Sequence, residues 1–151
     1  DDPEAALFTG LEDAEQAGMI TEGLAAAGVG VILPVAGTLG RSGVAVAAEH
    51  GILVIGGVGD TFLAEEDLAP VWLTSLAENA DVAVADTVTN VVETGDVGGP
   101  WVGTLTNGGV GLAPYRALEE PVPADLAEAV DGLAAEIAAA GGLAAFLASG
   151  E

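Results

Sequence analysis

The stretch GVGVILPVAGTLG, residues 28–40, decides the fold that the sequence predicts. Gly28 is a natural stop for a preceding helix, because glycine readily adopts the left-handed conformation that ends helices. The apolar run Val29–Leu33 follows directly and is typical of a parallel strand covered on both faces. Pro34–Gly40 then leads to the next helix. Helix, buried strand and glycine-rich loop in this order indicate an α/β protein.

The same alternation continues on both sides of this stretch. Apolar runs predict further strands at residues 5–9, 52–55, 71–74 and 101–105. Helical periodicity and glycine stops predict helices at residues 13–27, 42–50, 75–94 and 124–140, with a final turn or short helix at 142–147. This spacing predicts one α/β domain over residues 1–151, with a mostly parallel sheet and flanking helices.

Two capping patterns set the starts of predicted helices. Asp13 is followed three residues later by Gln16, and Ser75 is followed three residues later by Glu78. Both pairs match the capping box, in which the two side chains satisfy the first free N–H groups of a helix. The second pair therefore predicts a helix that begins at Ser75. Residues 56–70, glycine-rich and then acidic, are predicted to form a loop.

Charge narrows the classes of partner. The chain has 24 acidic residues against Arg41 and Arg116, with no lysine and a formal net charge of -22. Such a surface repels phosphate, which argues against nucleic acid and anionic lipid as partners. Two interpretations remain: a solvated acidic coat of the kind that salt adaptation produces, or a surface that docks a partner.

The residues that most catalytic and metal sites need are scarce. There is no cysteine, and His50 is the only histidine; it lies at the end of a predicted helix, where a dipole contact explains it. Without lysine there is no P-loop and no Schiff base. The acidic cluster Glu65–Asp67, with Asp60 nearby, lacks the EF-hand spacing and is interpreted as a solvated loop. We therefore expect neither an enzyme nor a cofactor or metal site.

Three loops follow predicted strands and combine glycine with small polar residues. They are Pro34–Gly40, Gly56–Asp60 and Thr104–Gly111. In a parallel α/β sheet, ligands bind outside the carboxyl ends of the strands, where loop N–H groups are free. The alternative for each loop is a tight turn with no ligand. Three such loops on one sheet favour a site for a neutral, polyhydroxylated ligand.

Four segments resemble a known family in order and spacing. VILPVAG at Val31–Gly37 resembles its "VIFPVAG" segment, and LVIG at Leu53–Gly56 resembles its "WVIG" strand. LTS at Leu73–Ser75, followed by DVAV at Asp81–Val84, resembles its "LTS…DVAV" junction. GGVGLAP at Gly108–Pro114 resembles its most specific signature. The family is the basic membrane protein family of purine-nucleoside-binding lipoproteins, and the chain resembles the second half of a full-length member.

The resemblance implies a lobe of a type I periplasmic-binding-protein fold. Members serve ABC importers, so a nucleoside-like ligand and an ABC permease are the implied partners. They are secreted and anchored through a lipid, which implies an extracytoplasmic location for the full-length protein. The first lobe, or a second copy of this chain, would supply the rest of the cleft. The alternative is a sensing or protein-interaction module that keeps the fold and has lost the transport ligand.

The resemblance also implies which positions face a ligand. The family's base-stacking aromatic falls at Leu33, and its ribose-binding aspartate falls at Val58, with Asp60 matching a second acidic position. The family's lysine before the last motif falls at Thr106. Loop backbone completes the predicted ligand-binding set, which is Leu33, Ala36, Gly37, Thr38, Val58, Asp60 and Thr106.

Overall fold

The computed structural model describes residues 13–150, without the side chain of Thr38. The helices are α1 (Ala14–Ala26), α2 (Gly40–Glu49), α3 (Thr61–Ala64), α4 (Ala80–Thr94), α5 (Ala124–Ala139) and α6 (Leu143–Ser149). The strands are β1 (Val31–Ile32), β2 (Leu53–Val58), β3 (Trp72–Glu78) and β4 (Val110–Leu112), and three 3-10 turns are η1 (Gly37–Leu39), η2 (Glu66–Val71) and η3 (Arg116–Leu118). The predicted strand at residues 5–9 lies outside the described residues.

The strands form one four-stranded sheet in the order β1-β2-β3-β4. Strands β1, β2 and β3 are parallel, with Val31 opposite Leu53 and Ile55 opposite Thr74. Strand β4 adds an antiparallel edge, with Leu76 opposite Leu112. The prediction of an α/β fold with a mostly parallel sheet and flanking helices is therefore confirmed.

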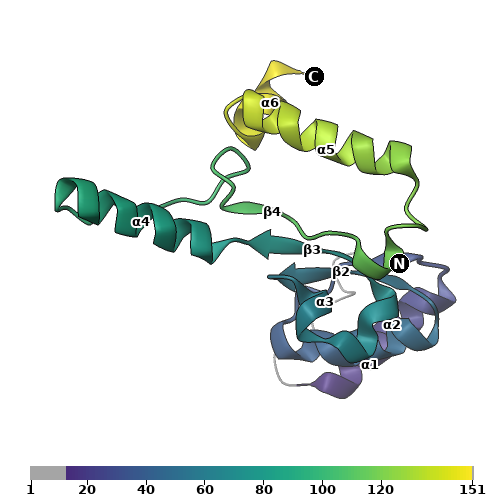
Figure 1. Ribbon diagram of the computed structural model, residues 1–151. Coiled ribbons are helices and arrows are strands. Elements are labelled where there is room, and N and C mark those ends of the chain that lie inside the picture. Colours follow the sequence, from purple (N-terminus) through teal and green to yellow (C-terminus); the bar gives the residue numbers. More distant parts are fainter. Residues whose placement is uncertain (1–12, 151) are drawn as a thin grey trace.

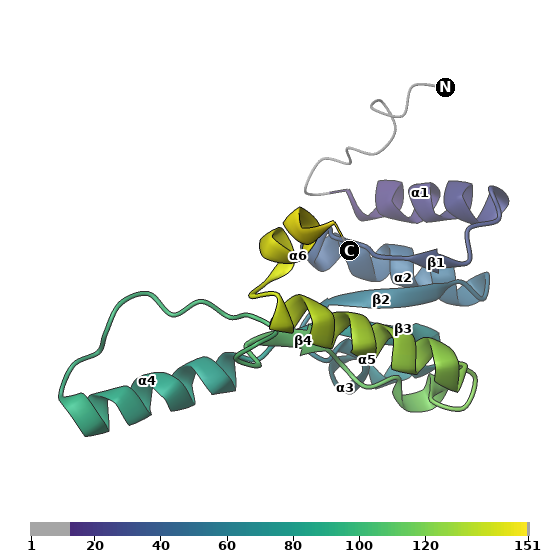
Figure 2. The same cartoon turned by 90° about the horizontal axis from the view of Figure 1, so that it is seen from above.

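The core lies between the sheet and α2, and α1 packs against the other side of α2 (Figure 2). Asp13 accepts a hydrogen bond from the Gln16 backbone N–H at 3.0 Å, so the predicted cap of α1 is confirmed. At the contact between α1 and α2, a Cβ added to Gly43 would stand 2.8 Å from Thr21 Oγ1, which explains the glycine. The buried core residues are Val44, Ala47, Ile52, Val54, Val71 and Trp72.

Helices α4, α5 and α6 lie apart from this core. Figure 1 shows α4 projecting away from the sheet and α5 standing off from β3 and β4, and the second view agrees for α4. None of the three helices contains a buried residue. In α4, Val88 is 56% exposed and Val92 is 79% exposed. Their apolar side chains therefore face solvent in this chain.

The described helices do not include one that could cross a membrane alone. Helices α5 and α6 have the length and composition only as a pair, and they are bent by 93° relative to each other.

The predicted helix start at Ser75 is wrong. Residues 75–78 continue strand β3, and Ser75 is 1% exposed between its neighbours β2 and β4. Its hydroxyl is hydrogen-bonded to Thr61 and not to a turn of its own helix. Helix α4 begins at Ala80, after Asn79. A serine followed three residues later by a glutamate is compatible with a helix cap and with the end of a strand. Pairing with β2 and β4 stabilises the strand here.

Three further predictions need correction. Residues 56–70 are not all loop, since they hold the end of β2, helix α3 and most of η2. The predicted strand at 101–105 is absent from the described chain because the side chain of Asn107 binds the backbone groups of Val102 and Thr104. The predicted loop Thr104–Gly111 does not end as a loop, because its last two residues belong to β4, which pairs with β3.

Candidate functional site

The main cavity has a volume of about 480 Å³ and lies at the carboxyl ends of the parallel strands. Residues 34–37 follow β1, Gly57 and Val58 end β2, and Leu76 and Glu78 end β3. This is where the α/β topology places ligand crevices, because the loops after the strands diverge there. A volume of a few hundred cubic ångströms matches sites for small organic ligands.

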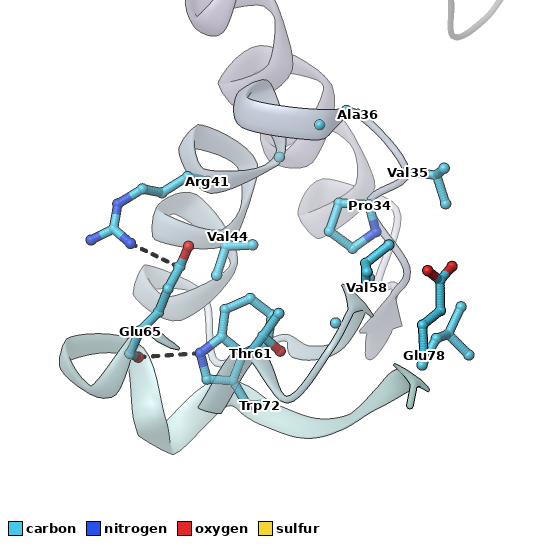
Figure 3. Close-up of a pocket in the computed structure, with 15 residues that line it drawn as sticks. Pro34, Val35, Ala36, Arg41, Val44, Val58, Thr61, Glu65, Trp72 and Glu78 are labelled. Carbon is cyan, nitrogen blue, oxygen red and sulfur yellow. Dashed lines mark hydrogen bonds and ion pairs between the residues drawn. The ribbon is translucent and has the colours of Figure 1, made fainter. Parts of the chain in front are cut away.

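The walls of the cavity are mostly apolar. Val44 reaches it from α2, and Trp72 from the start of β3. Trp72 is 4% exposed, and its Nε1–H donates to the Glu65 backbone carbonyl at 3.4 Å. Pro34 and Val58 close the opposite wall (Figure 3). A flat apolar ligand would find van der Waals partners on these walls.

Gly56 and Thr61 line the cavity, and Ser75 is buried behind them, outside the lining. Ser75 Oγ accepts a hydrogen bond from the Thr61 backbone N–H at 3.2 Å, and the two hydroxyls are bonded to each other. A Cβ on Gly56 would overlap both hydroxyl oxygens. The glycine therefore lets a strand, a helix start and a neighbouring strand meet at one point beneath the cavity.

Arg41 forms one side of the cavity with two carboxylates. Its guanidinium lies 2.8 Å from Glu65 Oε2 and 2.8 Å from Asp67 Oδ2. The negative charge of Asp67, and to a smaller extent that of Glu65, raises the pKa of Arg41 above its ordinary value. The side chain is therefore a cation throughout the accessible pH range. The predicted acidic loop is thus partly neutralised by an arginine of α2.

Glu78 lies on the other side of the cavity, at the end of β3 (Figure 3). Among residues 13–150, its carboxylate has neither an ion-pair partner nor a hydrogen-bonded side chain. Its backbone is fixed, because Glu78 pairs with Val110 and the next residue, Asn79, donates to the Gly109 carbonyl at 3.0 Å. Glu78 also borders a smaller hollow of about 230 Å³ that includes Trp101.

Three of the predicted ligand-binding residues line the main cavity: Ala36, Gly37 and Val58. Val58 is 74% exposed and stands at the opening. Leu33 lies instead in an adjoining cavity of about 280 Å³ between α1 and the loop after β1, which shares Ala36 with the main one. The side chain of Thr38 is outside what the structure describes. Two of the three predicted loops therefore meet at one site.

Asp60 and Thr106 lie outside the lining of the main cavity. Asp60 Oδ2 accepts a hydrogen bond from Arg116 Nη2 at 2.6 Å, which ties the loop after β2 to η3. Thr106 Oγ1 donates to the Ala138 carbonyl at 3.3 Å, beside α5. The third predicted loop is held by its own Asn107 and does not reach the cavity formed by the other two.

Several lining residues were not predicted. Trp72 stood within a predicted strand, and its aromatic ring was the available signal. Arg41 is one of only two basic residues, which was a signal that it has a specific partner. Glu78 was predicted to belong to a helix cap, so the sequence did not predict that it lies at the end of a strand.

His50 does not line the cavity. It was expected to contact a helix dipole; it caps α2, and its Nε2 lies 2.9 Å from Glu22 Oε2 of α1.

Neither a protein-family model nor a curated protein matches this chain. The likeness to the basic membrane protein family therefore rests on the four sequence motifs, and it stays a prediction.

Proposed function

We propose that this chain is one lobe of a solute-binding protein that holds a nucleoside-like ligand at the carboxyl ends of β1, β2 and β3. The observation that carries the proposal is the cavity of about 480 Å³ where two glycine-rich loops and the end of β3 converge. Its apolar walls suit a flat ring, and loop N–H groups beside Gly37 and Gly57 suit polar substituents. The ligand would be neutral or weakly polar, since the only cation at the cavity is already paired.

The uncovered helices support a two-lobed protein. Helix α4 carries Val84, Val88 and Val92 at exposures of 62%, 56% and 79%, and α5 carries Leu126 and Leu133 at 53% and 48%. Amphipathic helices gain most of their stability from packing such a face. A second lobe would cover these faces and close over the cavity by a hinge motion. By resemblance, the assembled protein is an extracytoplasmic lipoprotein that delivers its ligand to an ABC permease.

A gain-of-function variant tests the proposal. Val58→Asp places a carboxylate where the family has its ribose-binding aspartate, at an exposed position on the cavity rim. One hydrogen bond to a charged group contributes about 1.5–3 kcal/mol, so we expect nucleosides to bind the variant about tenfold or more tightly than the parent. Calorimetric titration with a panel of ribonucleosides measures this change.

Val102→Asp is the matched control, because it adds the same charge to an exposed valine that lies outside the cavity lining and outside the valine face of α4. We expect its nucleoside affinity to equal that of the parent. An absence of binding in the parent and in Val58→Asp would overturn the proposal. If both variants bind nucleosides more tightly than the parent by the same factor, the added charge acts independently of the cavity.

A sensing or interaction module is the second candidate. The placement of Asp60 against Arg116, and of Thr106 against α5, favours it, because neither side chain lines the cavity. The exposed valines of α4 are suited to a protein partner. The same nucleoside panel separates the candidates, since only a solute-binding lobe gains affinity at Val58.

A further inference from the structure

Glu78 lines the main cavity, and its carboxylate has no ion-pair partner within the part of the chain that the structure describes. The chain contains two arginines and no lysine. Arg41 pairs with Glu65 and Asp67, and Arg116 pairs with Asp60. Both arginines are therefore paired elsewhere, and the exposed Glu78 carboxylate has no side-chain donor among residues 13–150, so its oxygens can accept hydrogen bonds from a bound molecule or from water.

The position of Glu78 is set by regular structure. Leu76 and Glu78 are two residues apart in β3, so their side chains project from the same face of the strand, and both line the cavity. Pairing of Leu76 with Leu112 and of Glu78 with Val110 fixes the strand on its outer side. A carboxylate held on a strand is better placed to select a ligand than one on a loop.

The cavity between Glu78 and Arg41 is bounded by apolar side chains, including Pro34, Val58 and Trp72. A ligand that fills it would place an apolar ring between these walls and a polar edge against Glu78 (Figure 3). An ionised carboxylate only accepts hydrogen bonds and can accept two in parallel. The matching edge therefore presents two adjacent N–H donors and no acceptor between them.

Among the common nucleobases, guanine has this edge, in its N1–H and its exocyclic amino group. Adenine and cytosine each place a ring acceptor beside their amino group, and uracil flanks its single N–H with two carbonyl oxygens. We propose that Glu78 is a specificity-determining residue that binds the N1–H and amino edge of a guanine-type ring. This inference rests on the proposed nucleoside-binding function and names the base that the cavity prefers.

Guanosine and inosine test the inference, because they differ only by the exocyclic amino group. In the parent chain we expect guanosine to bind about tenfold more tightly than inosine, the value of one charge-assisted hydrogen bond at a partly exposed site. Glu78→Gln keeps the shape of the side chain and leaves a single acceptor. In this variant the guanosine preference should fall to about twofold or less, and inosine should weaken less than guanosine, because its single N1–H can still bond to the remaining amide oxygen.

Glu93→Gln is the matched control, since it removes the same charge from an exposed position of α4. It should keep the parent's preference for guanosine. If guanosine and inosine bind the parent equally, or if Glu78→Gln keeps the full preference, the role of Glu78 is wrong while nucleoside binding stands. If neither nucleoside binds, the proposed function fails and the inference fails with it.

Discussion

The region from α1 to β3 and the region from α4 to α6 differ in what they bury. Within residues 13–150, seven of the eight buried apolar residues lie in the first region, namely Leu39, Val44, Ala47, Ile52, Val54, Val71 and Trp72. The second region contributes Ala113. Both regions are rich in alanine, valine and leucine, so composition does not cause the difference. The difference lies in packing: in the first region the helices and strands pack onto one another, whereas in the second α5 contacts mainly α6.

The comparison shows which half of the chain is stable by its own packing. Helices α1 and α2 pack against each other, and α2 also packs against β2, whereas α4 makes few contacts with any other element. Isolated helices of this length are marginal in water, so α4 would gain stability from a surface that covers it. Under the proposed function, that surface is the other lobe. Three pairs of variants test how sharply packing differs along the chain.

The largest effect is expected at Trp72, in the first region. Trp72→Ala removes a ring that is 4% exposed and leaves a void among Val44, Val54 and Val71. Truncation of a buried tryptophan costs about 3–5 kcal/mol in the free energy of unfolding. Urea denaturation followed by far-ultraviolet circular dichroism measures the loss.

Trp101→Ala is the counterpart in the second region. Trp101 is partly exposed and donates from Nε1 to Asp86 at 3.0 Å. Loss of such an exposed hydrogen bond costs about 1 kcal/mol or less. Equal losses at Trp72 and Trp101 would contradict the division into a packed and an unpacked region.

An intermediate effect is expected where β2 passes beneath the cavity. Gly56→Ala places a methyl group onto the hydroxyls of Thr61 and Ser75, and overpacking of this kind costs about 1–3 kcal/mol. Gly57→Ala is the control, because a Cβ there would meet no heavy atom within 4 Å. Its unfolding free energy should stay within about 0.5 kcal/mol of the parent. A neutral Gly56→Ala would mean that the hydroxyl pair separates without cost.

The smallest effect is expected in α4. Val88 is 56% exposed, and alanine has the higher helix propensity, so Val88→Ala should change the unfolding free energy by no more than about 0.5 kcal/mol. The same substitution at Val44, which is 2% exposed in α2, should cost about 2 kcal/mol through lost burial and the resulting cavity. A large loss at Val88 would show that α4 is already covered, for instance by a second copy.

In both regions, the sequence predicted well the elements whose signals are local. The apolar runs at residues 29–33 and 52–55 lie between glycines and helices, and β1 and β2 form there. The helices at 13–27 and 124–140 agree with α1 and α5 to within one residue at each end. Elements whose identity follows from periodicity and stop residues need no knowledge of their neighbours.

The prediction failed where pairing between distant segments decides the structure. Ser75 has the spacing of a helix cap, and only its position between β2 and β4 makes it a strand residue. Because residues 75–78 were predicted to begin a helix, Glu78 was not predicted to line the cavity. Two predicted loops do meet at the main cavity, because parallel strands bring their carboxyl ends together. The loop near Thr106 does not, because β4 joins the sheet antiparallel.

The hydrogen bond from the Thr61 backbone to Ser75 has a consequence for the order of folding. The first N–H groups of a helix need acceptors, and Asp60, the residue before α3, makes no side-chain cap bond. The acceptor comes instead from Ser75, fourteen residues later and on another strand. Helix α3 therefore forms only after β3 has docked beside β2. We expect its amide hydrogens to become protected late in refolding, after those of α1 and α2.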